Sequence, residues 1–243
     1  LMKKTLNKSR IDLAAAYRLA DMYKLSEGIC NHLTLTLPTD PDRFLVVSYG
    51  THWSQVKASN LMIVNNKGAV IEGDGIVEDT AFYIHARVHA ERPDLKCLMH
   101  THQPYTLSIA MTENGRLIPA SQNSLRFYGR IAYDNEYNGL ALGSDEGDRI
   151  VKALGKKNIL LMANHGVLVG GETVAKTFDD LYYLERAAMA QVLASSTGQR
   201  LKTVSEKIAS DTANQIQSSN SFALEHFEAM KRVLDKTQPE YKE

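Results

Sequence analysis

Stretches with helical periodicity and stretches with strand periodicity follow one another along this chain. Residues 9–23 carry apolar side chains three or four positions apart, which is the spacing of an amphipathic helix. Residues 26–48 then alternate apolar and polar side chains around a break at residues 38–43 that contains two prolines, as in a hairpin. This interleaving excludes an all-helical or an all-strand fold and predicts an α/β architecture.

The same two patterns recur to the end of the chain. Further strands are expected at 61–64, 69–72, 95–102 and 158–171, and further helices at 78–94, 144–155 and 173–198. Residues 201–243 are more polar and end in one amphipathic helix. We therefore expect a three-layer α/β/α domain over residues 1–200 and a helical tail over 201–243 that packs on the domain or on a neighbouring subunit.

Composition limits the partners of the chain. The 28 basic residues equal the 28 acidic residues among 243, so no net field favours nucleic acid or an anionic membrane as a partner. The apolar run at 159–162 is too short to cross a bilayer, and the segment LMKKTLNKSR lacks the apolar core of a signal peptide. We expect a cytoplasmic location, in which Cys30 and Cys97 are buried, reduced thiols.

Two histidines lie at the end of a short apolar strand, in the stretch CLMHTHQPY. Side chains two positions apart on a strand point to the same side, so His100 and His102 project together, as two ligands of one metal ion do. The alternative is a pair of solvent-facing histidines on an edge strand. His165, in MANHGVLVGG, follows another apolar strand and supplies a third imidazole. Three neutral imidazoles and an open position are typical of a catalytic divalent-metal site.

The segments AERPDLKCLMHTHQPYTLSIAM and NILLMANHGVLVGGETVAKTFDDLYYLERAAMAQVLA together resemble the class II aldolase and adducin head-domain family. The combination of Arg-Pro-Asp, His-x-His and Asn-His-Gly is specific, and the likeness covers residues 9–198. It implies a central, mainly antiparallel sheet between helical layers, and usually a homotetramer. It also places His100, His102 and His165 at the positions of the family's three metal-binding histidines.

One position departs from the sugar-phosphate aldolases of this family. They carry an acid/base glutamate nineteen residues before the first histidine of the pair, and Ala81 occupies that position here. A methyl group cannot move a proton. Asp79 lies on another face of the helix and Glu78 lies a turn away, so both are weak substitutes. His85 follows one helical turn later and is our candidate catalytic base, with a buried packing histidine as the alternative. A tyrosine from a neighbouring subunit is a further candidate for the proton transfer.

The residues that match the family's phosphate site also differ. Asn31 persists, but Asp79 replaces a serine, and a carboxylate beside a phosphate is repelled. We therefore expect a substrate without a phosphate, bound by Asn31 and His32. Lys57, in the matching stretch VKASNLM, is a further candidate to bind a substrate carboxylate. A solvated side chain beside a loop is the alternative role of His32.

These features resemble the adducin-like branch of the family. They favour a divalent-metal-dependent lyase that breaks a carbon–carbon bond in a small hydroxy or keto acid. Zn²⁺ is the first expectation for the metal, with iron, manganese, cobalt and nickel as alternatives. Two other functions stay open: a non-enzymatic, adducin-like interaction module, and an iron-dependent oxygenase or decarboxylase that uses the same site.

Overall fold

An eight-stranded mixed sheet forms the centre of the molecule. The computed structural model describes residues 2–140, 143–219 and 221–243, and over these the strand order is β4-β3-β2-β1-β5-β8-β7-β6. Only β6 and β7 pair in parallel among the seven neighbouring pairs of described strands. The mainly antiparallel α/β fold expected from the sequence is thereby confirmed. The strands are β1 His32–Leu37, β2 Asp40–Val47, β3 Leu61–Asn65, β4 Val70–Glu72, β5 Cys97–Thr101, β6 Ile131–Asp134, β7 Ile159–Met162 and β8 Gly166–Gly171.

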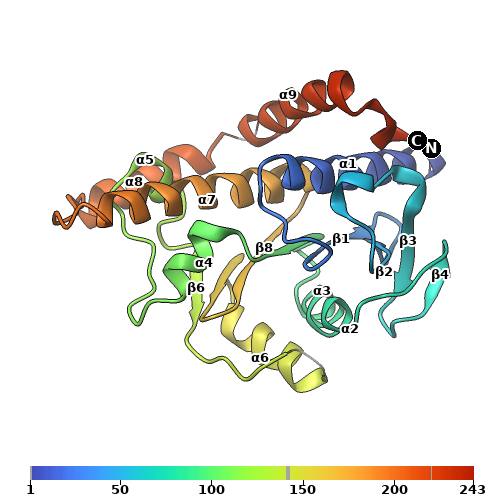
Figure 1. Ribbon diagram of the computed structural model, residues 1–243, viewed down its shortest axis with the longest axis horizontal. Helices are drawn as coiled ribbons and strands as arrows, with labels where there is room; N and C mark the ends of the chain where they lie inside the picture. The colour runs from blue at the N-terminus through green and yellow to red at the C-terminus, as the bar shows by residue number, and fades with distance from the viewer. Residues whose placement is uncertain (1, 141–142, 220) are drawn as a thin grey trace.

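Helices cover both faces of this sheet (Figure 1). The long helices α1 (Met2–Met22) and α7 (Val174–Ser195) lie on one face, with α9 (Phe222–Thr237) outside them. The other face carries α2 (Asp79–Ala81), a π-helical turn η3 (Phe82–Ala86), α3 (Arg87–Glu91) and α6 (Ser144–Leu154). The remaining elements are α4 Pro104–Ala110, α5 Gln122–Leu125, α8 Glu206–Gln217, and the 3₁₀ turns η1 Trp53–Gln55, η2 Ala58–Asn60 and η4 Pro239–Lys242.

The pleat of β1 separates an apolar face from a polar one. Leu33 and Leu35 join the large core beneath α1 and α7, so His32 and Thr34 point to the opposite face of the sheet. His32 is the cross-strand partner of His100 on β5. A layer of buried polar side chains therefore lies between the sheet and the segment from α2 to α3.

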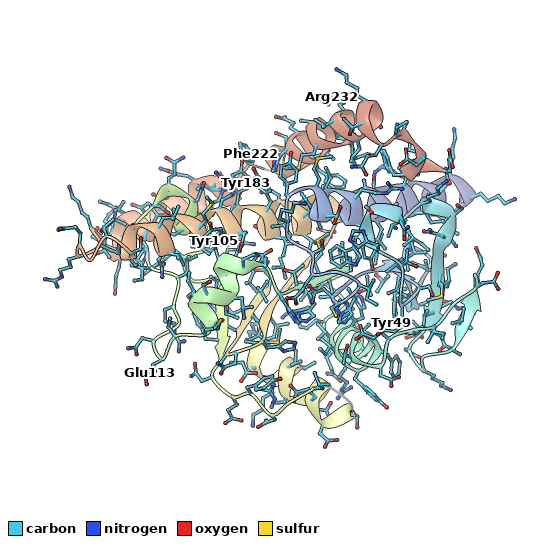
Figure 2. All side chains as sticks on the ribbon, in the orientation of Figure 1. Tyr49, Tyr105, Glu113, Tyr183, Phe222 and Arg232 are labelled. Carbon is cyan, nitrogen blue, oxygen red and sulfur yellow. The ribbon has the colours of Figure 1, made fainter. Side chains whose placement is uncertain are left out.

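The tail packs against the domain through aromatic side chains. Phe227 of α9 meets Phe178 of α7 with ring centroids 5.8 Å apart. Tyr183 and Phe222 lie close together on the same two helices (Figure 2), and the guanidinium of Arg126 lies over both rings. The expected terminal helix is present as α9, but the tail holds a second helix, α8, which starts with the hydroxyl of Ser205 accepting a hydrogen bond from the amide of Ile208.

The two cysteines differ in environment. Cys97 on β5 is buried, as expected, whereas Cys30 is exposed, so the expectation of a buried thiol is wrong there. Cys30 lies in the turn before β1, where its backbone forms a single bridge to Glu27 instead of a ladder inside the sheet. Among the described helices, none combines the length and the apolar character that crossing a bilayer requires.

Candidate metal centre

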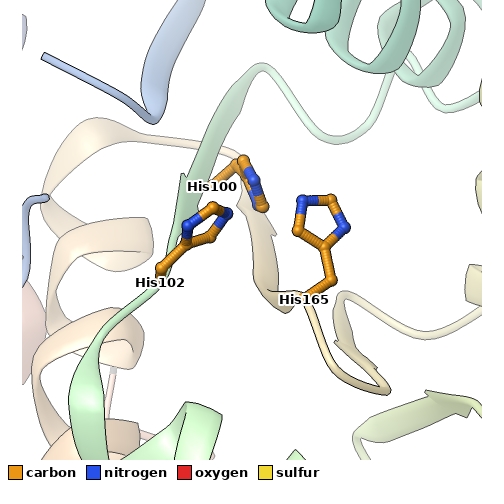
Figure 3. A group of neighbouring side chains, drawn as sticks. All are labelled: His100, His102 and His165. Carbon is orange, nitrogen blue, oxygen red and sulfur yellow. The ribbon is translucent and has the colours of Figure 1, made fainter. Parts of the chain in front are cut away.

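The structure brings His100, His102 and His165 together. One ring nitrogen of each can be chosen so that all three nitrogens lie within 4.8 Å of one another. The ring centroids are 4.8 Å apart for His100 and His165, 5.0 Å for His100 and His102, and 5.1 Å for His102 and His165. Figure 3 shows the three rings turned toward a common point. We call these three residues the histidine triad.

Two antiparallel neighbouring strands position the triad. His100 lies in β5, His102 follows it, and His165 ends the turn between β7 and β8. The glycine after His165 allows this approach, because a Cβ on Gly166 would stand 2.5 Å from the carbonyl oxygen of Thr101 and 2.8 Å from Cδ2 of His102. The Asn-His-Gly motif therefore includes glycine for a steric reason.

In His100 and in His102, a hydrogen bond at Nδ1 holds the ring in place and leaves Nε2 to act as a metal ligand. His100 Nδ1 lies 2.9 Å from the carbonyl oxygen of Val167, which can only accept, so Nδ1 carries the hydrogen and Nε2 keeps a lone pair. His102 Nδ1 lies 2.7 Å from a carboxylate oxygen of Glu27, which has the same effect. His102 Nε2 is buried and has no hydrogen-bond partner. Histidine ligands of metals are commonly held in this way by a carbonyl or a carboxylate.

Burial keeps two rings of the triad, those of His100 and His165, neutral. Burial lowers the pKa of His100 well below its ordinary value, and the nearby His165 adds to the effect. Burial also lowers the pKa of His165 to about 4, with a further contribution from His102. These two rings are therefore unprotonated at neutral pH, the state in which imidazole binds a metal. The unpartnered nitrogen and the neutral donor set fit a divalent transition metal.

Asn31 adds a polar group beside the triad. Its side-chain oxygen accepts a hydrogen bond from the amide of His102 at 3.1 Å, while its side-chain nitrogen is buried without a partner. Its φ of 76° is a left-handed conformation, which asparagine tolerates better than most residues and which often marks functional sites. The free amide hydrogens of Asn31 can bind a substrate oxygen next to the histidines.

His32 and His85 are two further buried histidines close to the triad. His32 is buried beside His100, with ring centroids 5.2 Å apart, and its Nε2 contacts Glu78 at 2.9 Å. His85 is fully buried, its Nε2 lies 3.2 Å from His32 Nδ1, and its Nδ1 lies 2.6 Å from Thr34 Oγ1. Both nitrogens of His85 are thus occupied, and a proton from a substrate reaches His85 only through His32. Direct catalysis by His85 stays a prediction.

Three acidic residues near the site have partners that the sequence did not reveal. Glu27 orients His102, and Glu78 contacts His32. Glu185 accepts hydrogen bonds from the amides of Tyr105 and Thr106 and so caps α4. Spacing gives no signal for Glu27, which is far from residue 102 in sequence. The position of Glu78, three residues before Ala81, was the one available signal.

Fold and site together define a class of protein. The chain has a mainly antiparallel α/β/α domain and carries a histidine triad at the ends of two neighbouring strands. The sequence pattern of the Class II Aldolase and Adducin N-terminal domain family matches residues 11–192. The chain belongs to this family.

Individual relatives agree with that assignment. A Caulobacter vibrioides protein, whose name places it provisionally in aldolase class 2, is 35% identical over 84% of this chain and 79% of its own length. An aldolase II superfamily protein from Pseudomonas syringae has a crystal structure that matches with a TM-score of 0.92 and 31% identity, over 98% of this chain and 96% of the other. Alpha-adducin of Rattus norvegicus is 36% identical over 78% of this chain, which corresponds to 26% of the adducin.

Proposed function

We propose that this protein is a divalent-metal-dependent lyase that breaks a carbon–carbon bond in a small, non-phosphorylated hydroxy or keto acid. Three buried side-chain nitrogens of the described residues lack a protein partner, and one of them, on Trp53, lies in the apolar core. The observation that carries the proposal is that the other two, on His102 and Asn31, lie together beside two neutral imidazoles. Buried polar atoms are rarely left unpaired unless a ligand takes the position. In a histidine cluster with a purely structural role, these nitrogens would be hydrogen-bonded to other protein groups.

Different residues of the chain would bind the metal ion and the substrate in such a reaction. His100, His102 and His165 would hold the ion, and we place Zn²⁺ first among the candidates. A bound divalent ion supplies Lewis-acid polarisation of a substrate carbonyl. Asn31 donates from its side-chain nitrogen to a substrate oxygen and fixes its orientation. The buried layer around His32 and Thr34 limits the access of water from the helical side of the site.

The surroundings support a substrate without a phosphate. Lys57, whose stretch corresponds to part of the family's phosphate site, forms an ion pair with Glu243 at 2.5 Å. The amide of Ser59 donates to the backbone oxygen of Glu243 at 2.7 Å. The carboxylate of Asp79 is exposed at the start of α2 and would repel a phosphate. A substrate carboxylate or carbonyl oxygen can instead accept a hydrogen bond from the unpaired side-chain amide of Asn31.

Exchange of carbon-bound hydrogen tests the reaction class without knowledge of the full substrate. Hydroxypyruvate in D₂O, followed by proton NMR, should lose its C3 hydrogens faster with the zinc-loaded protein than with buffer and zinc alone. His100→Ala should remove the acceleration together with the bound zinc. His52→Ala is the matched control, because His52 caps the turn η1, which packs against α1.

The alternative of an adducin-like interaction module rests on the identity with alpha-adducin and on Ala81. It predicts that neither zinc binding nor exchange depends on His100. Native protein that binds no zinc and accelerates no exchange would support the module. Exchange that requires oxygen and iron would support an oxygenase or decarboxylase instead. A homotetramer is part of our proposal, and light scattering of the purified protein measures it.

A further inference from the structure

A continuous chain of short polar contacts runs from the edge of the histidine triad into the core between β1 and α3. Every side chain in it is buried except the first, which is partly exposed. We call it the imidazole chain. Its members, in order from the site inward, are Glu78, His32, His85, Thr34, His89 and the backbone carbonyl of Leu95.

The inner end of the imidazole chain fixes the direction of its hydrogen bonds. His89 Nδ1 lies 3.1 Å from the carbonyl oxygen of Leu95, which only accepts, so Nδ1 carries a hydrogen. A second hydrogen on Nε2 would make a buried cation without an anionic partner in the chain, which is costly. His89 Nε2 is therefore an acceptor, and the hydroxyl of Thr34, 2.8 Å away, donates to it.

This direction propagates outward. Thr34 has one hydroxyl hydrogen, and because that hydrogen goes to His89, Thr34 accepts from His85 Nδ1 at 2.6 Å. His85 is fully buried and neutral by the same reasoning, so its Nε2 accepts. The donor to this nitrogen is His32 Nδ1, 3.2 Å away. His32 thus carries its hydrogen on the inner nitrogen.

At the outer end, the contact between His32 and Glu78 requires a proton in addition to the one on His32 Nδ1. His32 Nε2 lies 2.9 Å from Oε2 of Glu78. If His32 were neutral and Glu78 ionised, two lone pairs would face each other at that distance. Thr80 Oγ1 lies 3.2 Å from the same nitrogen. Its single hydrogen can bond to His32 or to Glu78, but it cannot remove the repulsion between the lone pairs of His32 Nε2 and Glu78 Oε2. The contact is stable only when His32 and Glu78 hold one proton between them.

We propose that Glu78 is the acid/base residue of this site, and that His32 and the imidazole chain behind it are positioning residues. The catalytic part of this proposal rests on the proposed function. Glu78 stands three residues, or about one helical turn, before Ala81, where the aldolase glutamate is missing. Asn31, His32, Glu78 and Ala81 line one small hollow, together with Tyr49. The carboxylate of Glu78 thus borders the space beside the methyl group of Ala81.

The proton balance of the cleavage then closes without a further reactant. Ionised Glu78 takes the hydrogen of the substrate's β-hydroxyl group, whose oxygen becomes a carbonyl oxygen. The carbon–carbon bond breaks, and its electron pair passes to the fragment that carries the original carbonyl, as an enediolate or enolate. Glu78 returns the same proton to the carbon of that fragment. His32 keeps its bond to Glu78 throughout and holds the carboxylate in place.

Two spectroscopic readouts locate the shared proton without any turnover. Nitrogen-15 spectra of the histidine rings, in zinc-free and zinc-loaded protein, should show hydrogen on Nδ1 alone for His85 and His89. The shared proton should appear on His32 Nε2, or as a carboxylic-acid band in the infrared that Glu78→Gln removes. A neutral His32 beside an ionised Glu78, or the opposite tautomer of His85 or His89, would overturn the proposal.

Kinetics test the catalytic part. Glu78→Gln should lower the rate of hydroxypyruvate exchange by at least about 100-fold, as loss of a general acid/base does, with the zinc content unchanged. Asp79→Asn, an exposed carboxylate one residue away, should keep the rate within about twofold of the native rate. An undiminished rate in Glu78→Gln contradicts catalysis by Glu78. Native protein without exchange, but with the shared proton in place, contradicts the proposed function and leaves the proton pair established.

Discussion

The histidine triad and the imidazole chain use the same side chain in opposite ways. In the triad, the outer nitrogens of His100 and His102 are bonded to protein, and the inner nitrogen of His102 has no partner. In the imidazole chain, both nitrogens of His85 and of His89 are bonded to neighbours inside the protein. The two regions meet where His32 lies beside His100.

The difference shows what separates a ligand from a structural histidine. Burial and neutrality are common to both regions, because burial lowers the pKa of His85 and His89 as it does that of His100. What differs is whether the second nitrogen has a protein partner. The triad therefore keeps a ring nitrogen free to bind a ligand, whereas the hydrogen bonds of the imidazole chain stabilise the fold and orient its rings. Four experiments test this distinction.

The largest effect should come from removal of a triad ring. His165→Ala should weaken Zn²⁺ binding by more than about 100-fold, because loss of a ligand costs more than loss of a residue that only orients one. Isothermal titration with zinc measures this change, and His52→Ala should bind zinc as the native protein does. An unchanged zinc affinity in His165→Ala would show that the triad is not the zinc site.

Acid should act on the imidazole chain through His89. Burial lowers the pKa of this residue to about 4 in the folded protein, against an ordinary value of 6.5. Above pH 6.5 the ring is neutral in both states, whereas between pH 6.5 and 4 only the unfolded chain takes up the proton. The free energy of unfolding should therefore fall with falling pH, by about 3 kcal/mol from this group in total.

Urea titrations of zinc-free protein between pH 7 and pH 4 measure that loss. The native protein should lose more stability over this range than His89→Gln, in which the titrating ring is absent. Equal losses in the two proteins would show that His89 is protonated in the folded state, and the directions assigned to the imidazole chain would then be wrong.

Thr34→Val should break the imidazole chain and leave the triad intact. Valine has a similar shape but no hydroxyl, so one nitrogen of His85 and one of His89 lose their partner, at about 1 kcal/mol each. We expect the free energy of unfolding to drop by about 2 kcal/mol and zinc affinity to stay within about threefold. Thr36→Val on the same strand, where the hydroxyl is near solvent, is the control for the substitution itself.

The smallest effect should come from the outer partner of a triad ring. Glu27→Gln replaces the carboxylate that accepts from His102 Nδ1, and it should weaken zinc binding by about tenfold. The side chain of Glu27 is 60% exposed, which places the expected loss at the lower end for such partners. A loss as large as that in His165→Ala would mean that Glu27 is itself a ligand.

Local patterns were sufficient for much of this protein. Apolar periodicity predicted α1, the segment from α2 to α3, α6 and α7, and the paired strands of the first half, because each pattern depends on which face of an element is buried. The helix α4 was missed because its first turn is capped by Glu185, which is remote in sequence. The exposure of Cys30 was missed because apolar neighbours in sequence do not bury a residue that lies in a turn.

The family, the order of most helices and strands, the proximity of His100 and His102, and the absence of a carboxylate at residue 81 all follow from the sequence alone. Three features required the three-dimensional structure: Glu27 orients one triad ring, Asn31 keeps a free amide, and Glu78 and His85 contact the two different nitrogens of His32. Strand periodicity fixes the face on which a side chain lies, since it is a local property of the backbone. The partners met on that face depend on strand register and helix packing, which join residues far apart in the chain.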